Sequence, residues 1–372
     1  MHCDALIIGA GPAGSSAARL LAQAGWRVVL VEKSEFPRRK VCGEFISAAT
    51  MPVLAACGVA DALDAAAGPA VTRVGAYAGD AMLAAPAQRN WGRALGREHL
   101  DLMLRDAAVA AGAVLLQPAE VTGLRRGPQG HVCDLEDGRE IAANTVIAAC
   151  GSWNAKGPFV VGDPMTGPSD LFAFKAHFQN SALPQGLMPL LAFPGGYGGL
   201  VHSDGGRTSL SCCIRRDALA RARTRHGGKA AEAVLAHIMA TTRGVRLALG
   251  HATLEGSFLA TGPIHPGIRK RQDDGVFFTG NIAGEAHPII AEGISMAIQS
   301  SGLLAKLLIA GRSEQYGGEW QNRFALRIRA ASVFAHLAMN GAGRHAGLAV
   351  LRAAPRLLDL GARISGKEPI AA

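Results

Sequence analysis

The feature that most constrains this chain is a glycine-rich turn between an apolar run and an alanine-rich run. The segment reads DALIIGAGPAGSSAARLLAQAGWRVVLVEKS and begins at Asp4. Gly9, Gly11 and Gly14 follow the spacing G-x-G-x-x-G. In that spacing the first glycine permits a tight turn, the second lets the backbone approach a pyrophosphate, and the third lets a helix pack closely on a strand. The pattern predicts a βαβ unit that binds a dinucleotide.

Two further features of this segment favour a nucleotide with free ribose hydroxyls. Pro12 and Ala13 begin the predicted helix, whose N-terminus carries roughly half a positive charge and faces the phosphates. Glu32, followed by Lys33, ends the next predicted strand. A carboxylate there accepts hydrogen bonds from both ribose hydroxyls and disfavours a 2′-phosphate. The segment therefore selects the adenosine diphosphate moiety of FAD or NAD over NADP.

The composition is typical of a globular protein with two lobes. The chain has 372 residues, of which 49% are hydrophobic and 18% charged, and single cores stop growing at roughly 250–300 residues. No stretch approaches the roughly 18 uncharged apolar residues of a membrane-spanning helix. The start shows neither the basic segment nor the cleavage site of a secretory signal. We therefore expect a cytoplasmic protein.

The distribution of cysteine, histidine and charge limits the partners. The seven cysteines form no C-x-x-C pair and the twelve histidines are scattered, which argues against a bound metal. The net charge of +9 gathers in residues 215–229 and after residue 311. Aromatic residues do not interleave with the basic run, which argues against nucleic acid. A solvated helix face, an acidic carrier protein and an anionic membrane surface remain alternatives.

Four segments together resemble a large family of FAD-dependent proteins. They are the glycine fingerprint, RRKVCGEFIS at 38–47, GREHLDLMLRDAAVAAGA at 96–113 and GVFFTGNIAGEAHPIIAEGISMAIQS at 275–300. The family includes para-hydroxybenzoate-type aromatic hydroxylases, flavin halogenases and geranylgeranyl reductases. The resemblance implies FAD as the cofactor, held without a covalent link.

The segment at 275–300 carries most of this resemblance. Gly280, Pro288 and Gly293 match the family motif G-D-A-x-x-x-x-x-P-x-x-G-x-G, but Asn281 stands where the family has aspartate. The resemblance implies that residue 281 meets the ribityl chain, that Pro288 lies beside the isoalloxazine ring, and that a helix begins at Gly293 toward the flavin. The cofactor-binding residues so predicted are Gly9, Gly11, Pro12, Ala13, Gly14, Glu32, Lys33, Arg39, Lys40, Cys42, Gly43, Arg97, Val121, Gly280, Asn281, Pro288, Gly293 and Ile294.

Three residues are candidates for catalysis. Cys42 and Glu44 lie in KVCGEF, which resembles a segment against the flavin in the reductase and halogenase branches, and Cys42 is either a reactive thiol or a passive wall residue. His287 either orients a substrate or peroxide, or only fixes its loop. The segment LAFPGGYGGLV resembles one that lines the family's substrate pocket, which implies pocket roles for Phe193, Pro194 and Tyr197.

The predicted fold is α/β, with a Rossmann-type FAD-binding domain, an inserted antiparallel-sheet substrate domain and C-terminal helices. Alternating apolar residues broken by Gly-Gly and Asp-Gly predict the inserted sheet, and apolar residues at 3–4 spacing predict the terminal helices. These helices pack on the core, close the pocket, or meet a membrane or partner. The predicted parts are residues 1–75, 97–155 and 255–310 for FAD, 76–96 and 156–254 for substrate, and 311–372 for the helices.

The resemblance implies an FAD-dependent oxidoreductase that acts on a small apolar or aromatic biosynthetic intermediate, free or bound to a carrier protein. Monooxygenation is the first expectation. A reductase or dehydrogenase of carbon-carbon bonds is the alternative, ahead of a halogenase or a non-catalytic flavoprotein. Cys150 stands where aromatic hydroxylases carry an aspartate that helps to bind FAD and NADPH, so the electron donor, NADH, NADPH or another source, stays open.

Overall fold

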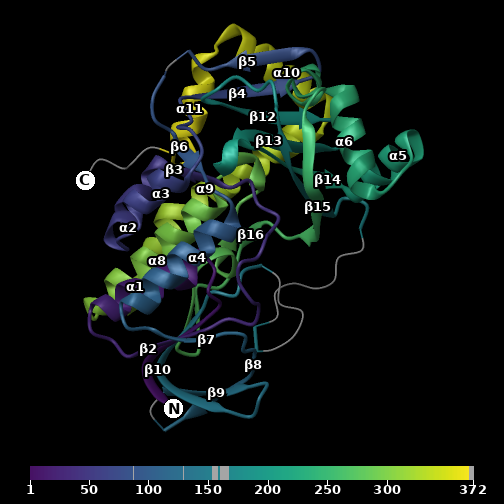
Figure 1. The fold of residues 1–372 in the computed structure, drawn as a ribbon. Helices are drawn as coiled ribbons and strands as arrows, with labels where there is room; N and C mark the ends of the chain where they lie inside the picture. The colour runs from purple at the N-terminus through teal and green to yellow at the C-terminus, as the bar shows by residue number, and fades with distance from the viewer. Residues whose placement is uncertain (87, 129, 153–157, 160–166, 368–372) are drawn as a thin grey trace.

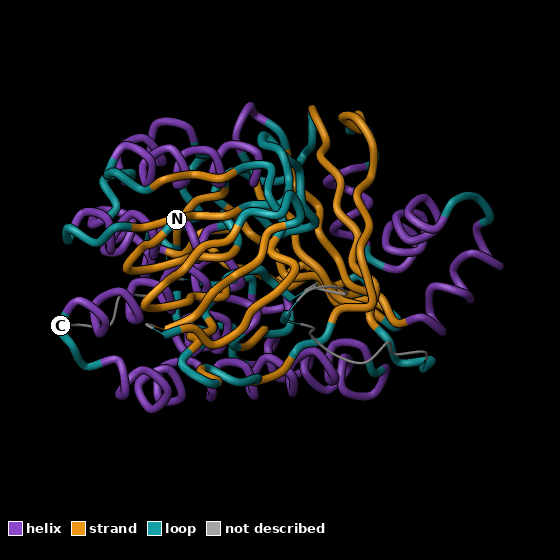
Figure 2. Tube along the Cα trace, turned by 90° about the horizontal axis from the view of Figure 1, so that it is seen from below, coloured by secondary structure: helices purple, strands orange, loops and turns teal. Residues whose placement is uncertain are grey.

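Two large sheets carry most of the strands, one in the lower and one in the upper part of the view, with helices beside and between them (Figure 1). This mixed α/β architecture confirms the predicted fold class. Figure 2 shows the strands gathered in the middle of the molecule and the helices at its periphery. The computed structural model describes residues 1–86, 88–128, 130–152, 158–159 and 167–367.

The first sheet is built on the N-terminal strand β1 (His2–Ile8), which pairs in parallel with β2 and β10. Its apolar run is buried on both faces, which is typical of a central parallel strand. The other strands of this sheet are β2 (Val28–Val31), β7 (Val114–Leu116), β8 (Val121–Gly127), β9 (Gly130–Leu135), β10 (Glu140–Ala148), β17 (Gln272–Asp273) and β18 (Val276–Phe278).

Helices α1 (Pro12–Gln23), α4 (Arg97–Ala110) and α8 (Gly293–Ile309) pack beside one another at this sheet. The glycine pattern explains how α1 comes so close. Gly9 has φ +104°, and a Cβ added at Gly14 would lie 1.8 Å from the Gly9 carbonyl oxygen. Only glycine fits at these two positions, as the turn predicts.

The second sheet has the strand order β15-β11-β14-β13-β12-β4-β5. Along its strand β11, Phe174 and Phe178 face a core under helices α5–α7, whereas Lys175 and His177 face the first sheet's domain. Its elements and covering helices are β4 (Arg73–Ala78), β5 (Ala81–Ala84), β11 (Leu171–Gln179), β12 (Leu187–Phe193), β13 (Gly196–His202), β14 (Thr208–Arg215), β15 (Thr253–Ile264), α5 (Arg216–His226), α6 (Ala230–Thr241) and α7 (Arg243–Leu249).

The strand memberships differ at two places from the predicted domain boundaries. Strand β4 begins at Arg73 and strand β15 runs from Thr253 to Ile264, and both belong to the second sheet. The predicted FAD-binding ranges 1–75 and 255–310 therefore include residues of the second sheet. The reason is physical: both strands pair with partners far along the chain, which no local pattern reports. The smaller connecting elements are β3 (Phe45–Ser47), α2 (Met51–Ala56), α3 (Ala60–Ala66), β6 (Gly92–Ala94), β16 (Gly267–Ile268) and β19 (Gly284–Glu285).

Three helices close the chain: α9 (Tyr316–Met339), α10 (Gly341–Ala353) and α11 (Arg356–Ile364). Helix α9 buries Trp320, Phe324 and Ile328 in the main core, so it belongs to the folded body, and Figure 1 shows it running between the two sheets' domains. Within the described residues, no helix combines the length and the apolar character needed to cross a membrane.

Candidate functional site

The N-terminus of α1 faces a space that fits a diphosphate. Gly11 is its N-cap and no side chain caps the helix there. A Cβ added at Gly11 would meet only the Arg97 guanidinium, at 3.8 Å. Uncapped amide groups at a helix start, with a cation beside them and no side chain in front, suit a phosphate. The turn therefore fits the pyrophosphate of a dinucleotide.

Glu32 lies at the end of β2 and is 3% exposed. It accepts hydrogen bonds from the Ala10 amide at 2.9 Å and the Ser34 amide at 2.9 Å. Arg38 donates to it at 2.7 and 3.2 Å. The carboxylate therefore stabilises the glycine turn, and it lies at the strand end where the motif predicts a contact with the ribose.

Removing this carboxylate should weaken cofactor binding. A charge-assisted hydrogen bond contributes about 1.5–3 kcal/mol, so Glu32→Ala is expected to lower the affinity for FAD at least tenfold. The fluorescence of FAD released on dilution measures this. Glu35→Ala, at an exposed neighbouring position, is the matched control and should retain the cofactor. Retention of FAD by both variants would contradict the placement of Glu32.

Arg97, at the first turn of α4, is held by a bidentate ion pair. Its Nε and Nη2 donate to Asp101 at 2.6 and 2.8 Å, and Asp101 is 1% exposed. Burial opposes the charged form of Arg97, but the Asp101 carboxylate outweighs it and raises the pKa of the guanidinium. A fixed, permanently charged group beside Gly11 matches the role predicted for Arg97.

The segment KVCGEF lies against the inner face of the second sheet. A Cβ at Gly43 would come within 3.2 Å of the Ser211 hydroxyl on β14. Glu44 adopts φ +63°, an uncommon conformation for a residue with a side chain, and its amide donates to Cys42 Sγ at 3.4 Å. This turn directs the Glu44 side chain into the interface between the two sheets' domains.

Glu44 forms a buried polar cluster with two residues of β11. Its carboxylate is paired with the Lys175 ammonium and, at 2.9 Å, with His177 Nε2, and all three residues are at most 1% exposed. Burial alone would raise the pKa of Glu44, but the His177 hydrogen bond and the Lys175 charge hold it at about 2. Both carboxylate oxygens are occupied, so this geometry favours a positioning role over the catalytic role predicted for Glu44.

Glu98 extends this cluster. One carboxylate oxygen of Glu98, one carboxylate oxygen of Glu44 and one ring nitrogen of His177 lie within 4.8 Å of one another, which is the spacing of atoms that could hold a metal ion. Lys175 neutralises Glu44, and Arg207 neutralises Glu98 at 2.7 Å. The two carboxylates are therefore already paired with positive side chains of the protein, which take the place that a bound cation would have.

The ion pair of Glu44 makes the free energy of unfolding depend on pH. Its ordinary pKa is 4.5 and its folded pKa about 2, so its contribution is full above pH 4.5 and is lost as pH falls toward 2. The difference corresponds to about 3 kcal/mol. We expect the urea midpoint of the wild type to fall more steeply below pH 5 than that of Glu44→Gln. Equal slopes for the two proteins would contradict this assignment.

The loop after β18 carries the family motif. Gly280 has φ +70°, and a Cβ there would lie 2.9 Å from Ala13 in α1, so the loop and the dinucleotide turn touch. The Asn281 amide donates to Glu285 at 3.3 Å, and the Asn281 carbonyl accepts from Arg269. The loop therefore lies directly beside the dinucleotide turn, and hydrogen bonds of Asn281 with Arg269 and Glu285 fix its backbone and side chain.

Lys367 reaches the start of α8 from the end of the described chain. Glu292, the N-cap of α8, is 0% exposed and accepts from Ser47 at 3.0 Å and from Lys367 Nζ at 2.9 Å. Lys367 also donates to the Ile290 carbonyl. In front of Gly293 an added Cβ would meet nothing within 4 Å. The space beyond this helix start is open, as a site for the flat ring requires.

His287 belongs to a buried aromatic cluster below the second sheet. Its Nδ1 lies 3.0 Å from the Tyr197 hydroxyl, and its ring stacks edge-on against His336 at 6.0 Å. Burial, helped by the charge of His336, lowers the pKa of His287 to about 4. Burial also raises the pKa of Tyr197. At neutral pH both side chains are uncharged, and a hydrogen-bonding proton lies between them.

The other predicted site residues lie in different surroundings. Lys33 and Lys40 are exposed and Val121 is buried in the main core, while Arg39 contacts His177 Nδ1 at 3.4 Å. Phe193 does not face the loop after β18, residues 280–293, which we call the flavin loop. Its side chain is 0% exposed and lies in the core under α5–α7, against His237. Its pocket role is not supported, because successive strand residues face opposite sides of a sheet.

Two functional residues were missed by sequence reasoning, Lys175 and Lys367. Lys175 had a local signal, since a single charge inside the apolar run LFAFKAHF predicts a buried partner. Lys367 had none, because the carboxylate that it pairs with lies 75 residues away.

Residues 2–191, just over half of the chain, match the FAD binding domain family. The chain therefore belongs to this family, as expected from its motifs. The fit of the α1 turn, Glu32 and Arg97 to a dinucleotide agrees with FAD as its cofactor.

Among curated proteins the chain is similar to a menaquinone reductase of Mycolicibacterium smegmatis, at 30% identity over 160 residues. It is also similar to a digeranylgeranylglycerophospholipid reductase of Methanothrix thermoacetophila, at 31% identity over 175 residues. These matches cover 42% and 41% of this chain and 39% and 42% of the two relatives. The chain thus spans about two fifths of their lengths.

Solved structures share the whole fold. The flavin-dependent brominase Bmp2 superimposes with a TM-score of 0.79 at 20% identity, over 99% of this chain and 94% of its own. A geranylgeranyl bacteriochlorophyll reductase-like protein of Thermoplasma acidophilum gives 0.74 at 17% identity, over 99% and 92%. At these identities the likeness concerns the fold alone.

Proposed function

We propose that this protein reduces a carbon-carbon double bond of an apolar substrate. The observation that carries the proposal is the uncharged Tyr197–His287 pair beside the flavin loop. Saturating a double bond takes a hydride at one carbon and a proton at the other, and bound FAD supplies the hydride chemistry. The names of the two curated relatives, both reductases, support the same reaction class.

The protein's own part is to hold and deliver the proton. In this proposal the Tyr197 hydroxyl donates to His287 Nδ1, so the imidazole hydrogen is on Nε2 and faces the substrate. As that proton passes to the substrate, the Tyr197 proton moves to Nδ1, and a proton from solvent then restores the hydroxyl. Because His287 is 7% exposed and Tyr197 is 0% exposed, His287 is the member of the pair that meets a ligand. Tyr197 then positions the ring and fixes its tautomer. Its neighbour Cys213 lies in the same buried layer.

Replacing His287 should slow the reaction without releasing FAD. General acid catalysis contributes at least about 10²-fold, so His287→Phe is expected to lower kcat by roughly that factor. His287→Gln keeps a donor and should recover part of the loss. Because the pKa of His287 is about 4, the wild-type kcat should show no titration of this group between pH 6 and 8. Unchanged turnover in His287→Phe would contradict its role.

A second candidate function is monooxygenation, the first expectation from the sequence. The apolar character of the loop and of α8 favours it, because excluding water protects reactive oxygen species from unproductive decay. Against it stands Cys150 in place of the aspartate of aromatic hydroxylases. Burial raises the pKa of Cys150 to about 11, so it offers a neutral thiol where that aspartate would offer a charge.

One experiment separates the two functions. The FAD-loaded enzyme is reduced and mixed with a polyprenyl quinone or a prenylated lipid, once without oxygen and once under labelled O2. We expect anaerobic saturation of a double bond and no label in the product. Incorporation of label, with no anaerobic turnover, would overturn the reductase in favour of the monooxygenase. Comparing NADH and NADPH in the same assay tests each as the electron donor.

A further inference from the structure

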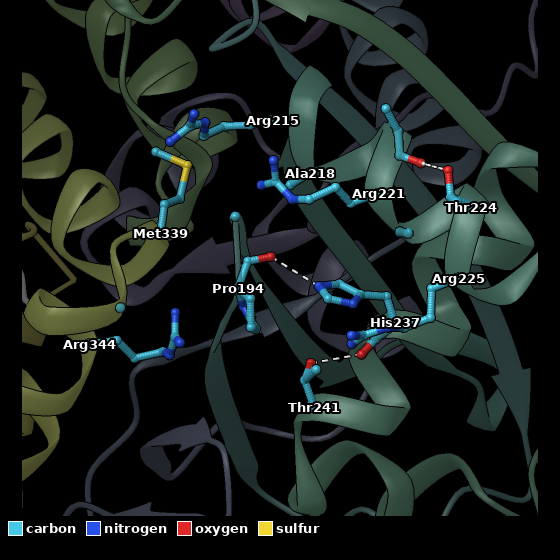
Figure 3. Close-up of a pocket in the computed structure, with 14 residues that line it drawn as sticks. Pro194, Arg215, Ala218, Arg221, Thr224, Arg225, His237, Thr241, Met339 and Arg344 are labelled. Atoms are coloured by element: carbon cyan, nitrogen blue, oxygen red, sulfur yellow. Dashed lines mark hydrogen bonds between the residues drawn. The ribbon is translucent and has the colours of Figure 1, made fainter.

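A cavity lies between α5 and the junction of α9 with α10 (Figure 3). Its volume is about 820 Å³. Four of the residues that line it are arginines, Arg215, Arg221, Arg225 and Arg344, and none of its lining residues is acidic. The walls come from four separate segments of the chain, at 194–195, 215–225, 237–241 and 339–344, so the folded structure gathers these charges.

The arginines enter the cavity lining from different sides. Figure 3 shows Arg221 extending from α5 and Arg344 from α10 toward each other across the cavity. The first residue of the 13-residue helix α10, Gly341, also lines it, although Asn340 Oδ1 already accepts from the Ala342 and Gly343 amides of that helix start.

The protein does not neutralise these charges. Asp217 is shared by Arg215 at 2.8 Å and Arg221 at 3.1 Å. Among the described residues, no carboxylate is paired with Arg225 or Arg344. Four arginines against one carboxylate leave three positive charges without a counterpart. His237, on the cavity wall, accordingly has a pKa lowered by burial and by the positive charges of Arg225 and Arg221.

The cavity shares two walls with the proposed active site. Pro194 and Gly195 line it, and Tyr197 follows two residues later on β13, about 7 Å along an extended strand. On the other side, Met339 lines the cavity and its carbonyl accepts from the Gly195 amide at 3.3 Å. His336, which contacts His287, lies in the same last turn of α9. The cavity and the Tyr197–His287 pair are therefore built on neighbouring residues of the same two segments.

We propose that this arginine cavity binds a phosphate or diphosphate group at the polar end of the enzyme's substrate. Several arginines around one oxyanion are a common way to bind phosphate, because the guanidinium fork matches its oxygens in pairs. That the group belongs to the substrate rests on the proposed function. The binding of the group itself does not.

The first test measures binding of inorganic diphosphate to the FAD-loaded protein by calorimetry. We expect saturable binding that weakens as KCl is raised. The double variant Arg221→Gln/Arg344→Gln should lose at least tenfold in affinity. Arg223→Gln on α5 and Arg352→Gln on α10 alter arginines of the same helices outside the cavity lining and should bind as the wild type. Arg221 is 68% exposed, so its replacement leaves the core intact, and circular dichroism checks this.

The second test asks what carries the group. Farnesyl diphosphate, farnesol and diphosphate are each titrated while the flavin absorbance is recorded. If the group is part of an apolar substrate, farnesyl diphosphate binds more tightly than either fragment and perturbs the flavin spectrum. Equal affinity for diphosphate and farnesyl diphosphate would overturn the substrate assignment.

Three results would overturn the site itself. They are the absence of saturable diphosphate binding, equal affinity in the double variant, and adsorption to phosphatidylglycerol vesicles without diphosphate binding. The last would make this face a membrane-docking surface. None of them depends on turnover, so the reductase proposal can fail in the oxygen experiment while this one stands, and the reverse.

Discussion

Replacing Lys175 by methionine is expected to lower the free energy of unfolding by about 3–5 kcal/mol, because it leaves a carboxylate buried without its cation. Glu44 and Lys175 are at most 1% exposed, so no water reaches the unpaired charge. Urea denaturation followed by flavin fluorescence measures the change. Lys270→Met removes one partner of the exposed Lys270–Asp273 pair at 2.9 Å and should change stability by less than about 1 kcal/mol.

A second substitution tells whether the buried charge is the cause. In Lys175→Met/Glu44→Gln the charge is gone, and most of the lost stability should return, because a buried pair replaced as a whole costs far less than one that is broken. If the double variant is no more stable than Lys175→Met, then packing of the lysine stem, and not charge, accounts for the loss.

Lys367→Met should have an effect of similar size, about 3–5 kcal/mol, and should also act on the cofactor. Glu292 is 0% exposed and, among the described residues, would keep only Ser47 as a side-chain donor, at 3.0 Å. Since Glu292 caps α8 at the flavin loop, we expect weaker FAD retention together with a lower melting temperature.

The control for this variant is Lys306→Met, a lysine near the other end of α8 that is exposed. It should leave both the melting temperature and the cofactor unchanged. Full retention of FAD with a lowered melting temperature would show that Lys367 stabilises the fold without shaping the cofactor site.

Local patterns were sufficient for the dinucleotide turn. Gly9, Gly11 and Gly14 report backbone geometry that only glycine adopts, and the acid at residue 32 falls where the next strand ends. Every interaction in that prediction lies within about one βαβ unit, so spacing alone fixes it. The family match and the described geometry both agree with it.

The polar interface between the domains depends on contacts that no spacing encodes. Glu44 and Lys175 are 131 residues apart in sequence, and they meet only because β11 crosses above the segment KVCGEF. Phe193 was placed by resemblance on the substrate side, but the alternation of strand β12 turns it to the opposite core. A one-residue difference in register decides such a side chain's face.

The contacts of Lys367 with Glu292 and with the Ile290 carbonyl affect the order in which parts of the cofactor site form during synthesis. Domains emerging from a ribosome fold from the N-terminus onward as their residues appear. The glycine turn and β1 are synthesised long before residue 367, whereas Glu292 lacks its lysine partner until that residue has emerged. A growing chain therefore cannot complete this ion pair before residue 367 has emerged, and any product cut short before this lysine would carry a nucleotide-binding turn without a completed ring-binding loop.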